Sequence, residues 1–170
     1  MKLRLQVARA LAIAVLLLAS SALAADDEVS VADDGTLTIA RVVPIERAAL
    51  LRVLTDPALA SDLAPDVLSK DLLEAGDCPI YRVATKGLFR PLVYSFRSCS
   101  SESGVTEQLV ASEDFDAFAC RWHLLPAAGG TEIRYELLVK PRLGVPHKLV
   151  RAGQRRSMRK TLKRLVELAQ

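Results

Sequence analysis

Between residues 67 and 140, apolar and polar side chains alternate in a series of short runs, the period of β-strands that cover one face. Residues that favour turns, mainly glycine, proline, serine and aspartate, separate these runs. Because the connections are short, we expect each strand to pair with the next as an antiparallel meander. The predicted strands are 67–74, 78–86, 91–99, 105–112, 116–125 and 131–140.

The segment before this meander predicts a hairpin and two short helices. Strand-like segments at 28–32 and 36–43 flank Asp33-Asp34-Gly35, a sequence typical of a hairpin turn. Helical spacing follows, and its apolar positions are Leu50, Leu51 and Leu54. Asp56-Pro57 ends or bends that helix, so a second short helix is expected over residues 57–63.

The pairing of 78–86 with 91–99 can be tested for consistency. A turn near Leu88-Phe89 gives partners whose numbers sum to about 177. One face then carries Tyr81, Val83, Leu92, Tyr94 and Phe96, and the other carries Ile80, Arg82, Ser95 and Arg97. A shift by one residue would mix the two sets, which favours this register.

The next two strands extend the apolar face. Their alternating apolar residues are Phe118, Cys120, Trp122, Leu124, Ile133, Tyr135, Leu137 and Val139. Their opposite faces carry Arg121, His123, Glu132, Arg134 and Glu136. We therefore expect a one-sided sheet with a large apolar concave face that another element must cover.

A helix over residues 149–170 is the expected cover. Its apolar stripe comprises Met158, Leu162, Leu165 and Ala169. At 1.5 Å per residue it would be about 33 Å long, enough to cross the sheet. Gly153, Ser157 and Thr161 repeat on a neighbouring line, where small residues either leave space beneath the helix or allow close packing.

The first 24 residues predict a signal peptide. Lys2, Arg4 and Arg9 precede the apolar run LAIAVLLLAS, and Ala22 and Ala24 form an A-x-A cleavage pattern. The run is shorter than the roughly 20 residues that span a bilayer. We expect cleavage near Ala24 and an exported chain, periplasmic or secreted, whose residues 25–170 form one domain.

Charge is distributed unevenly in the expected mature chain. Without the leader, 20 Lys and Arg balance 20 Asp and Glu. Residues 140–170 hold ten basic residues and one acid, whereas 25–139 hold ten basic residues and nineteen acids. A neutral, exported chain argues against a nucleic-acid partner, which usually binds a net basic domain.

This order of elements resembles the START-related (SRPBCC) superfamily of polyketide cyclases and lipid-transfer proteins, over about residues 36–170. The segments that carry the resemblance are IERAALLRVLTDPALASDLAPD, FACRWHLLPAAGGTEIRYELLVKPRLGVP and LVRAGQRRSMRKTLKRLVELA. The run from Trp122 to Pro126, followed by Gly130-Thr131, is the most family-like part. The resemblance implies an α+β helix-grip fold, in which a curved antiparallel sheet wraps around a long C-terminal helix and two short helices follow the first strand.

In that family the sheet and the long helix enclose a cavity for lipids, sterols, polyketides or other apolar ligands. The ligand-cavity candidates of this chain are Tyr81, Val83, Leu92, Tyr94, Phe96, Phe118, Trp122, Tyr135, Leu137, Ser157 and Thr161. The aromatic members are either ordinary core or a wall that grips an apolar body while a hydroxyl orients a polar head. Lys70, Asp71 or Arg82 could serve the same purpose if turned inward.

The residue numbers of Cys78 and Cys99 also sum to 177, so in the same strand register the two cysteines would lie opposite one another. Export favours a disulfide between them, and two free thiols near strand ends are the alternative. Cys120 falls on the apolar face, where a buried small hydrophobe is expected.

The sequence contains no motif for a metal, a cofactor or a catalytic nucleophile. His123 and His147 are isolated, and the spacings of metal-binding histidines are missing. A phosphate-binding glycine loop and a G-x-S-x-G turn are missing too. We therefore expect no metal and no cofactor.

The basic residues of the last helix have two interpretations besides the nucleic-acid partner already argued against. They either form a solvated face or dock on anionic phospholipid, to which each contributes about 1 kcal/mol near the surface. These membrane-contact candidates are Arg155, Arg156, Arg159, Lys160, Lys163 and Arg164.

Three functions follow from these features. The favoured one is an exported monomer that binds or transfers a lipid or another apolar small molecule in the cavity. The alternative is an enzyme of the cyclase, dehydrase or hydrolase kind that uses the same cavity, although no cyclase active site can be matched. The third is a structural envelope protein whose interior is filled core.

Overall fold

The computed structural model describes residues 28–64, 66–87, 90–142, 144 and 146–170. The predicted signal peptide and the Leu88-Phe89 turn lie outside these residues.

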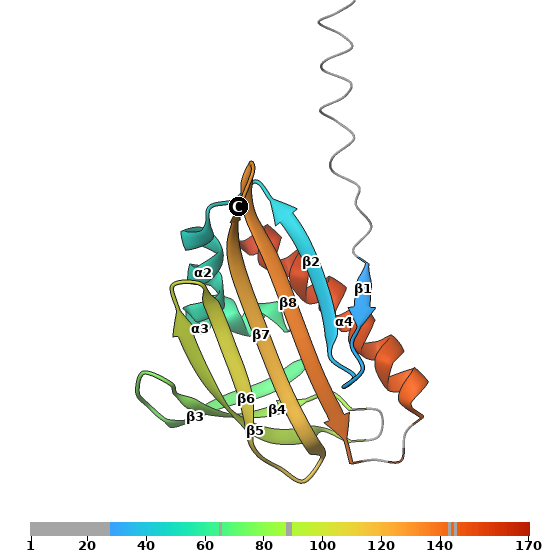
Figure 1. Ribbon diagram of the computed structural model, residues 1–170. Helices are drawn as coiled ribbons and strands as arrows, with labels where there is room; N and C mark the ends of the chain where they lie inside the picture. Colours follow the sequence, from blue (N-terminus) through green and yellow to red (C-terminus); the bar gives the residue numbers. More distant parts are fainter. Residues whose placement is uncertain (1–27, 65, 88–89, 143, 145) are drawn as a thin grey trace, which may run out of the picture.

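The described residues form a single curved antiparallel sheet of eight strands, in the order β1-β2-β8-β7-β6-β5-β4-β3 (Figure 1). The strands are β1 (Val29–Val31), β2 (Leu37–Val43), β3 (Val67–Glu74), β4 (Ile80–Thr85), β5 (Leu92–Ser101), β6 (Gly104–Ser112), β7 (Phe115–Ala127) and β8 (Gly130–Pro141). The helices are α2 (Arg47–Thr55), α3 (Pro57–Leu63) and α4 (His147–Leu168). The predicted meander is confirmed from β3 to β8, and the β1–β2 hairpin adds to it along β8.

The register predicted for β4 and β5 is confirmed. Tyr81 pairs with Phe96 and Val83 pairs with Tyr94, so these four side chains share the inner face. Ile80 pairs with Arg97 on the outer face but is only 5% exposed. By register it lies beside the Cys78–Cys99 disulfide, which is on the same face.

The turn between β7 and β8 is tighter than the sequence predicted. We expected a break from Pro126 to Gly130, but β7 continues to Ala127 and Pro126 pairs with Thr131. Proline is tolerated there because the described pairing of β6 with β7 stops at His123, which leaves Pro126 beyond the end of that neighbour. Gly129, at φ 84°, supplies the left-handed conformation of the turn.

The helices begin and end for local reasons. Pro57 cannot continue α2, and the Asp56 side chain accepts hydrogen bonds from the backbone N–H groups of Ala58 (2.9 Å) and Leu59 (3.4 Å). This N-cap starts α3 directly after α2, as the sequence predicted.

Helix α4 crosses the inner face of the sheet and also contacts α2 and α3 (Figure 1). Its stripe of Met158, Leu162, Leu165 and Ala169 is buried, as predicted. The stripe packs with apolar residues of β2, β7, β8 and α2, which include Leu37, Ile39, Leu50, Val53, Leu124 and Ile133. The core therefore lies under the second half of the helix.

Candidate ligand cavity

A cavity of about 1190 Å³ lies between the sheet, α3 and the first half of α4. Strands β3 to β8 all contribute to its wall. The wall includes all eleven residues that the sequence marked as ligand-cavity candidates: Tyr81, Val83, Leu92, Tyr94, Phe96, Phe118, Trp122, Tyr135, Leu137, Ser157 and Thr161. The geometry brings these residues together, and their contact with a ligand stays a prediction.

Small residues on α4 leave room beneath the helix. Gly153, Ser157 and Thr161 all line the cavity. These small residues therefore leave space between the helix and the sheet, and do not serve to pack the two closely. A Cβ atom built on Gly153 would meet nothing within 4 Å. The helix roofs the cavity with its first half and closes the core with its second half.

Aromatic rings cover much of the wall. The ring centre of Tyr94 lies 4.9 Å from that of Phe118, 5.2 Å from Phe115 and 6.0 Å from Phe96. Trp122 and Tyr135 stack with ring centres 3.8 Å apart. These contacts fix the rings in place, so the cavity has a preformed apolar wall.

One acidic side chain in the wall was missed by the sequence analysis. Glu107 on β6 pairs with Ser98 of β5 and with Cys120 of β7, which places it on the inner face. It is surrounded by protein, and the surface it keeps accessible faces the cavity. Burial raises the pKa of the Glu107 carboxyl, against smaller opposing effects of the Lys70 charge and of a hydrogen bond with the Cys120 thiol.

Lys70 also lies on the inner face, close to Glu107. On β3 it pairs with Val83, and its Nζ lies 4.2 Å from the ring centre of Tyr81 and 5.7 Å from that of Phe96. These are cation–π distances, which suit the charged ammonium. Asp71 and Arg82, the other two inward candidates, are exposed and pair with one another on the outer face.

Burial holds three further titratable groups of the wall in their neutral form: Tyr94, Tyr135 and Cys120. Burial raises the pKa of the Tyr94 hydroxyl, and the nearby Glu107 and Cys120 raise it further. Burial likewise raises the pKa of the Tyr135 hydroxyl and of the Cys120 thiol well above their usual values. These groups therefore offer O–H and S–H hydrogen bonds and do not act as nucleophiles at neutral pH.

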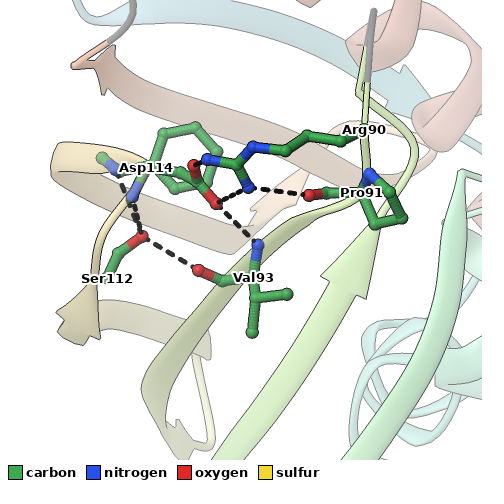
Figure 2. A network of polar contacts seen from close by, with 6 residues as sticks. Arg90, Pro91, Val93, Ser112 and Asp114 are labelled. Carbon is green, nitrogen blue, oxygen red and sulfur yellow. Dashed lines mark hydrogen bonds and ion pairs between the residues drawn. The ribbon is translucent and has the colours of Figure 1, made fainter.

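A polar network fixes the wall where β5 begins (Figure 2). The buried Asp114 carboxylate accepts hydrogen bonds from the backbone N–H of Val93 (2.9 Å) and from both terminal nitrogens of Arg90, which lines the cavity. The Ser112 hydroxyl donates to the Val93 carbonyl (3.0 Å) and accepts from the backbone N–H groups of Asp114 and Phe115. The Val93 hydrogen bond, and next the Arg90 guanidinium, hold the pKa of Asp114 below its usual value.

The predicted disulfide is present between Cys78 and Cys99, whose Cα atoms lie 4.4 Å apart. It joins β5 to the segment before β4 on the outer face, away from the cavity wall. Cys120 is a free thiol and is buried, as expected.

Neither histidine belongs to a candidate metal site. Among the described residues, no group of three His, Cys, Asp or Glu side chains is placed to hold a metal ion. His123 lies on the outer face, with Nε2 3.9 Å from a carboxylate oxygen of Glu136, and His147 is exposed at the start of α4.

The membrane-contact candidates lie on the exposed side of α4. Arg155, Arg156, Arg159, Lys160, Lys163 and Arg164 are all exposed. Lys163 and Arg164 lie 3.7 and 3.5 Å from the Glu167 carboxylate, and Arg156 and Lys160 also border the cavity. Across the part of the chain that the structure describes, no helix is long and apolar enough to cross a bilayer.

Solved structures share this arrangement, although no family model and no curated protein matches the sequence. The Zhui aromatase/cyclase from Streptomyces sp. R1128 aligns with a TM-score of 0.67 at 12% identity, over 79% of this chain and 92% of that one. A START superfamily protein from Mycobacterium smegmatis aligns at 0.65 and 14%, over 78% of this chain and 94% of that one. The protein TTHA0849 from Thermus thermophilus aligns at 0.65 and 17%, over 79% and 96%. The resemblance seen in the sequence is thus confirmed in the architecture, and this chain has the START-related helix-grip fold.

Proposed function

We propose that this protein is an exported carrier that holds a lipid-like hydrophobic molecule in the cavity between the sheet and α4. The observation that carries the proposal is the cavity itself, with about 1190 Å³ of space beneath the first half of the helix. Ligand sites are typically about 300–1000 Å³ and mostly apolar, with a few polar groups that fix orientation. A filled interior would have supported a purely structural role.

The driving force for binding would be burial of apolar ligand surface. Each methylene removed from water contributes about 0.8 kcal/mol. Part of that gain is offset by the lost freedom of the ligand, and a preformed aromatic wall keeps the cost of reorganising the protein low.

The direct test is native mass spectrometry of the protein purified from its own host, followed by organic extraction. We expect one hydrophobic molecule per chain, and the emptied protein should take up a fluorescent fatty-acyl probe. A protein that comes out empty and also fails to take up the probe would overturn the carrier proposal.

Export is part of the proposal, and the Cys78–Cys99 disulfide supports it because such bonds persist in oxidising compartments. N-terminal sequencing of the chain recovered from the periplasm or the medium should begin at Ala25. Recovery of the intact precursor from the cytoplasm would contradict this part alone.

An enzymatic function is the second candidate, favoured by Glu107 and Lys70 in the same cavity. A carboxyl with a raised pKa and a nearby ammonium are the kind of pair that moves protons in catalysis. One of the proteins that share this fold is described as an aromatase/cyclase. Mass spectra of the ligand before and after incubation distinguish the two functions, because a carrier returns its ligand unchanged and a dehydrase returns it with one water lost.

A further inference from the structure

We propose that Glu107 and Lys70 form an anchor for acceptor oxygens, so that the ligand of this cavity is an apolar molecule with a carbonyl or carboxylate group. The inference rests on the proposed ligand-binding function and narrows the chemical class of the ligand.

The position of Glu107 is the first part of the argument. By register it lies between Ser98 and Cys120 on the inner face. A carboxyl group has several hydrogen-bonding positions, and among the described residues the partner that the structure gives it is the weak Cys120 thiol. Because the thiol is a weak partner, the carboxyl keeps hydrogen-bonding positions that a ligand in the cavity could fill.

The position of Lys70 is the second part. Its ammonium lies over the Tyr81 and Phe96 rings and is close enough for its charge to act on Glu107. An ammonium has three N–H donors and no acceptor. A ligand oxygen near both side chains would receive hydrogen bonds from the Lys70 ammonium and from the protonated Glu107 carboxyl.

The protonation of the anchor decides which ligand group fits. Because burial raises its pKa, the Glu107 carboxyl favours the neutral form, which carries an O–H donor. The Lys70 ammonium donates hydrogen bonds in either state of Glu107, and the protonated Glu107 carboxyl adds an O–H donor. A ketone, ester or carboxylate oxygen accepts from such a pair, whereas a ligand amine would meet the like charge of Lys70.

The experiment uses four probes with the same eighteen-carbon chain and the same cis double bond: oleic acid, methyl oleate, oleylamine and cis-9-octadecene. Displacement of a fluorescent fatty-acyl probe measures their affinities for the full mature chain. We expect the acid and the ester to bind about tenfold or more tightly than the amine and the alkene, the difference that one hydrogen bond to a charged group produces.

Two substitutions locate the effect. Glu107→Leu and Lys70→Met keep roughly the same side-chain size, and each removes one member of the anchor. The double variant removes both and should bring acid and ester binding within about twofold of the alkene. Glu102→Leu is the control, since Glu102 is exposed on the β5–β6 turn, and it should keep the wild-type preference. Circular dichroism of each variant confirms that it is folded.

The outcomes separate the two proposals. Equal binding of all four probes, a preference for the amine, or an acid and ester preference that survives in the double variant would overturn the anchor and leave the carrier function standing. Failure of every probe to bind the folded wild-type protein would overturn the carrier function, and the anchor with it.

Discussion

Two carboxyl groups in this molecule, Glu107 and Asp114, have opposite pKa shifts for physical reasons that the structure makes plain. Glu107 faces an apolar cavity, where burial disfavours the charged form. Asp114 is covered by its neighbours but lies near the surface, and a backbone N–H and a guanidinium donate to it. The Glu107 carboxyl therefore lowers the stability of the folded protein but places a polar group inside the cavity. The Asp114 carboxylate raises that stability.

Glu107→Gln should stabilise the protein at neutral pH. In the unfolded chain Glu107 ionises near its usual value of 4.5, whereas the folded state favours the protonated form up to its raised pKa. The wild type therefore loses stability as the pH rises from about 4.5 through the folded pKa, and the variant does not. We expect a gain of about 1–3 kcal/mol at pH 7, the usual cost of a poorly paired buried group.

Thermal unfolding across a pH series measures this gain, which should vanish below about pH 4, where both states of the wild type are protonated. A difference between variant and wild type that is constant with pH would contradict the account.

Asp114→Asn should destabilise the protein. The Asp114 carboxylate contributes stability above its unfolded value of 3.8, and this contribution is lost as the pH falls through its lowered folded value. Because Arg90 is 57% exposed, the contribution is modest, and we expect a loss of about 1–2 kcal/mol at pH 7. Asp116→Asn is the matched control: its ion pair with Arg142 is exposed on both sides and should cost less than about 1 kcal/mol. Equal losses in urea unfolding of the two variants would contradict the role given to Asp114.

At the scale of elements, the strands and helices were predictable because their signals are local. Alternation of apolar residues marked β4, β5, β7 and β8, and Asp56-Pro57 marked the boundary between α2 and α3. The sum of 177 gave the β4–β5 register, because the turn and the apolar face both pointed to it. The extent of β7 was wrong at Pro126, since whether a proline fits a strand depends on the neighbour that its missing N–H would have faced.

The polar members of the cavity wall were harder to predict, for two different reasons. On β6 the inward positions are Val105, Glu107 and Leu109 and the outward ones Thr106, Gln108 and Val110, so both faces mix polar and apolar residues. Alternation then gives no contrast from which to choose a face. On β3 a register shift after Val67 breaks the period of two and brings Lys70 to the inner face three residues later.

The disulfide should stabilise the β4–β5 hairpin. It links residues 21 apart, and the chain-entropy model gives roughly 3 kcal/mol for a loop of that length. Replacing both Cys78 and Cys99 by alanine should lower the free energy of unfolding by about this amount in urea titrations. Dithiothreitol should lower the stability of the wild type similarly and leave the double variant unchanged; a wild type insensitive to the reductant would refute the prediction.

Helix α4 offers a way to separate binding from folding. Ser157 is a small residue that lines the cavity. Ser157→Phe should fill part of the cavity and weaken binding of a fatty-acyl probe by about tenfold or more. The loss of stability should be small, because the cavity has room for the larger side chain. Ala152 is exposed on the same helix, and Ala152→Phe should leave affinity unchanged. Similar affinities for the two variants in fluorescence titrations would show that the ligand lies elsewhere.

At the scale of the whole molecule, the fold divides its interior into two parts. Met158, Leu162 and Leu165 of α4 pack in a closed core, and the small residues on a neighbouring line of the same helix roof an open cavity. The closed part supplies the stability that the open part cannot, since a cavity forfeits packing contacts. The sequence predicted the apolar stripe but not the separation into a packed core and an open cavity. The distance between helix and sheet depends on the curvature of the whole eight-stranded sheet, which no local pattern in the sequence specifies.

The basic residues of the chain are concentrated in its last thirty-one residues. We therefore predict that the protein docks on an anionic membrane through α4. Arg155 and Lys160 are exposed on the helix that roofs the cavity, so a membrane bound there would lie beside the ligand. Each basic residue near an anionic surface contributes about 1 kcal/mol, and the double change Arg155→Gln with Lys160→Gln should weaken binding to phosphatidylglycerol vesicles about 30-fold at low salt. Arg121→Gln with Arg134→Gln removes the same charge from the outer face of the sheet and should weaken vesicle binding far less.

Vesicle sedimentation measures the affinity of both double variants, and the attraction should weaken as the salt is raised because the charges are exposed. If the two double variants lose affinity equally, net charge and not the helix governs the contact; if the wild type binds phosphatidylcholine as well as phosphatidylglycerol, the docking idea fails.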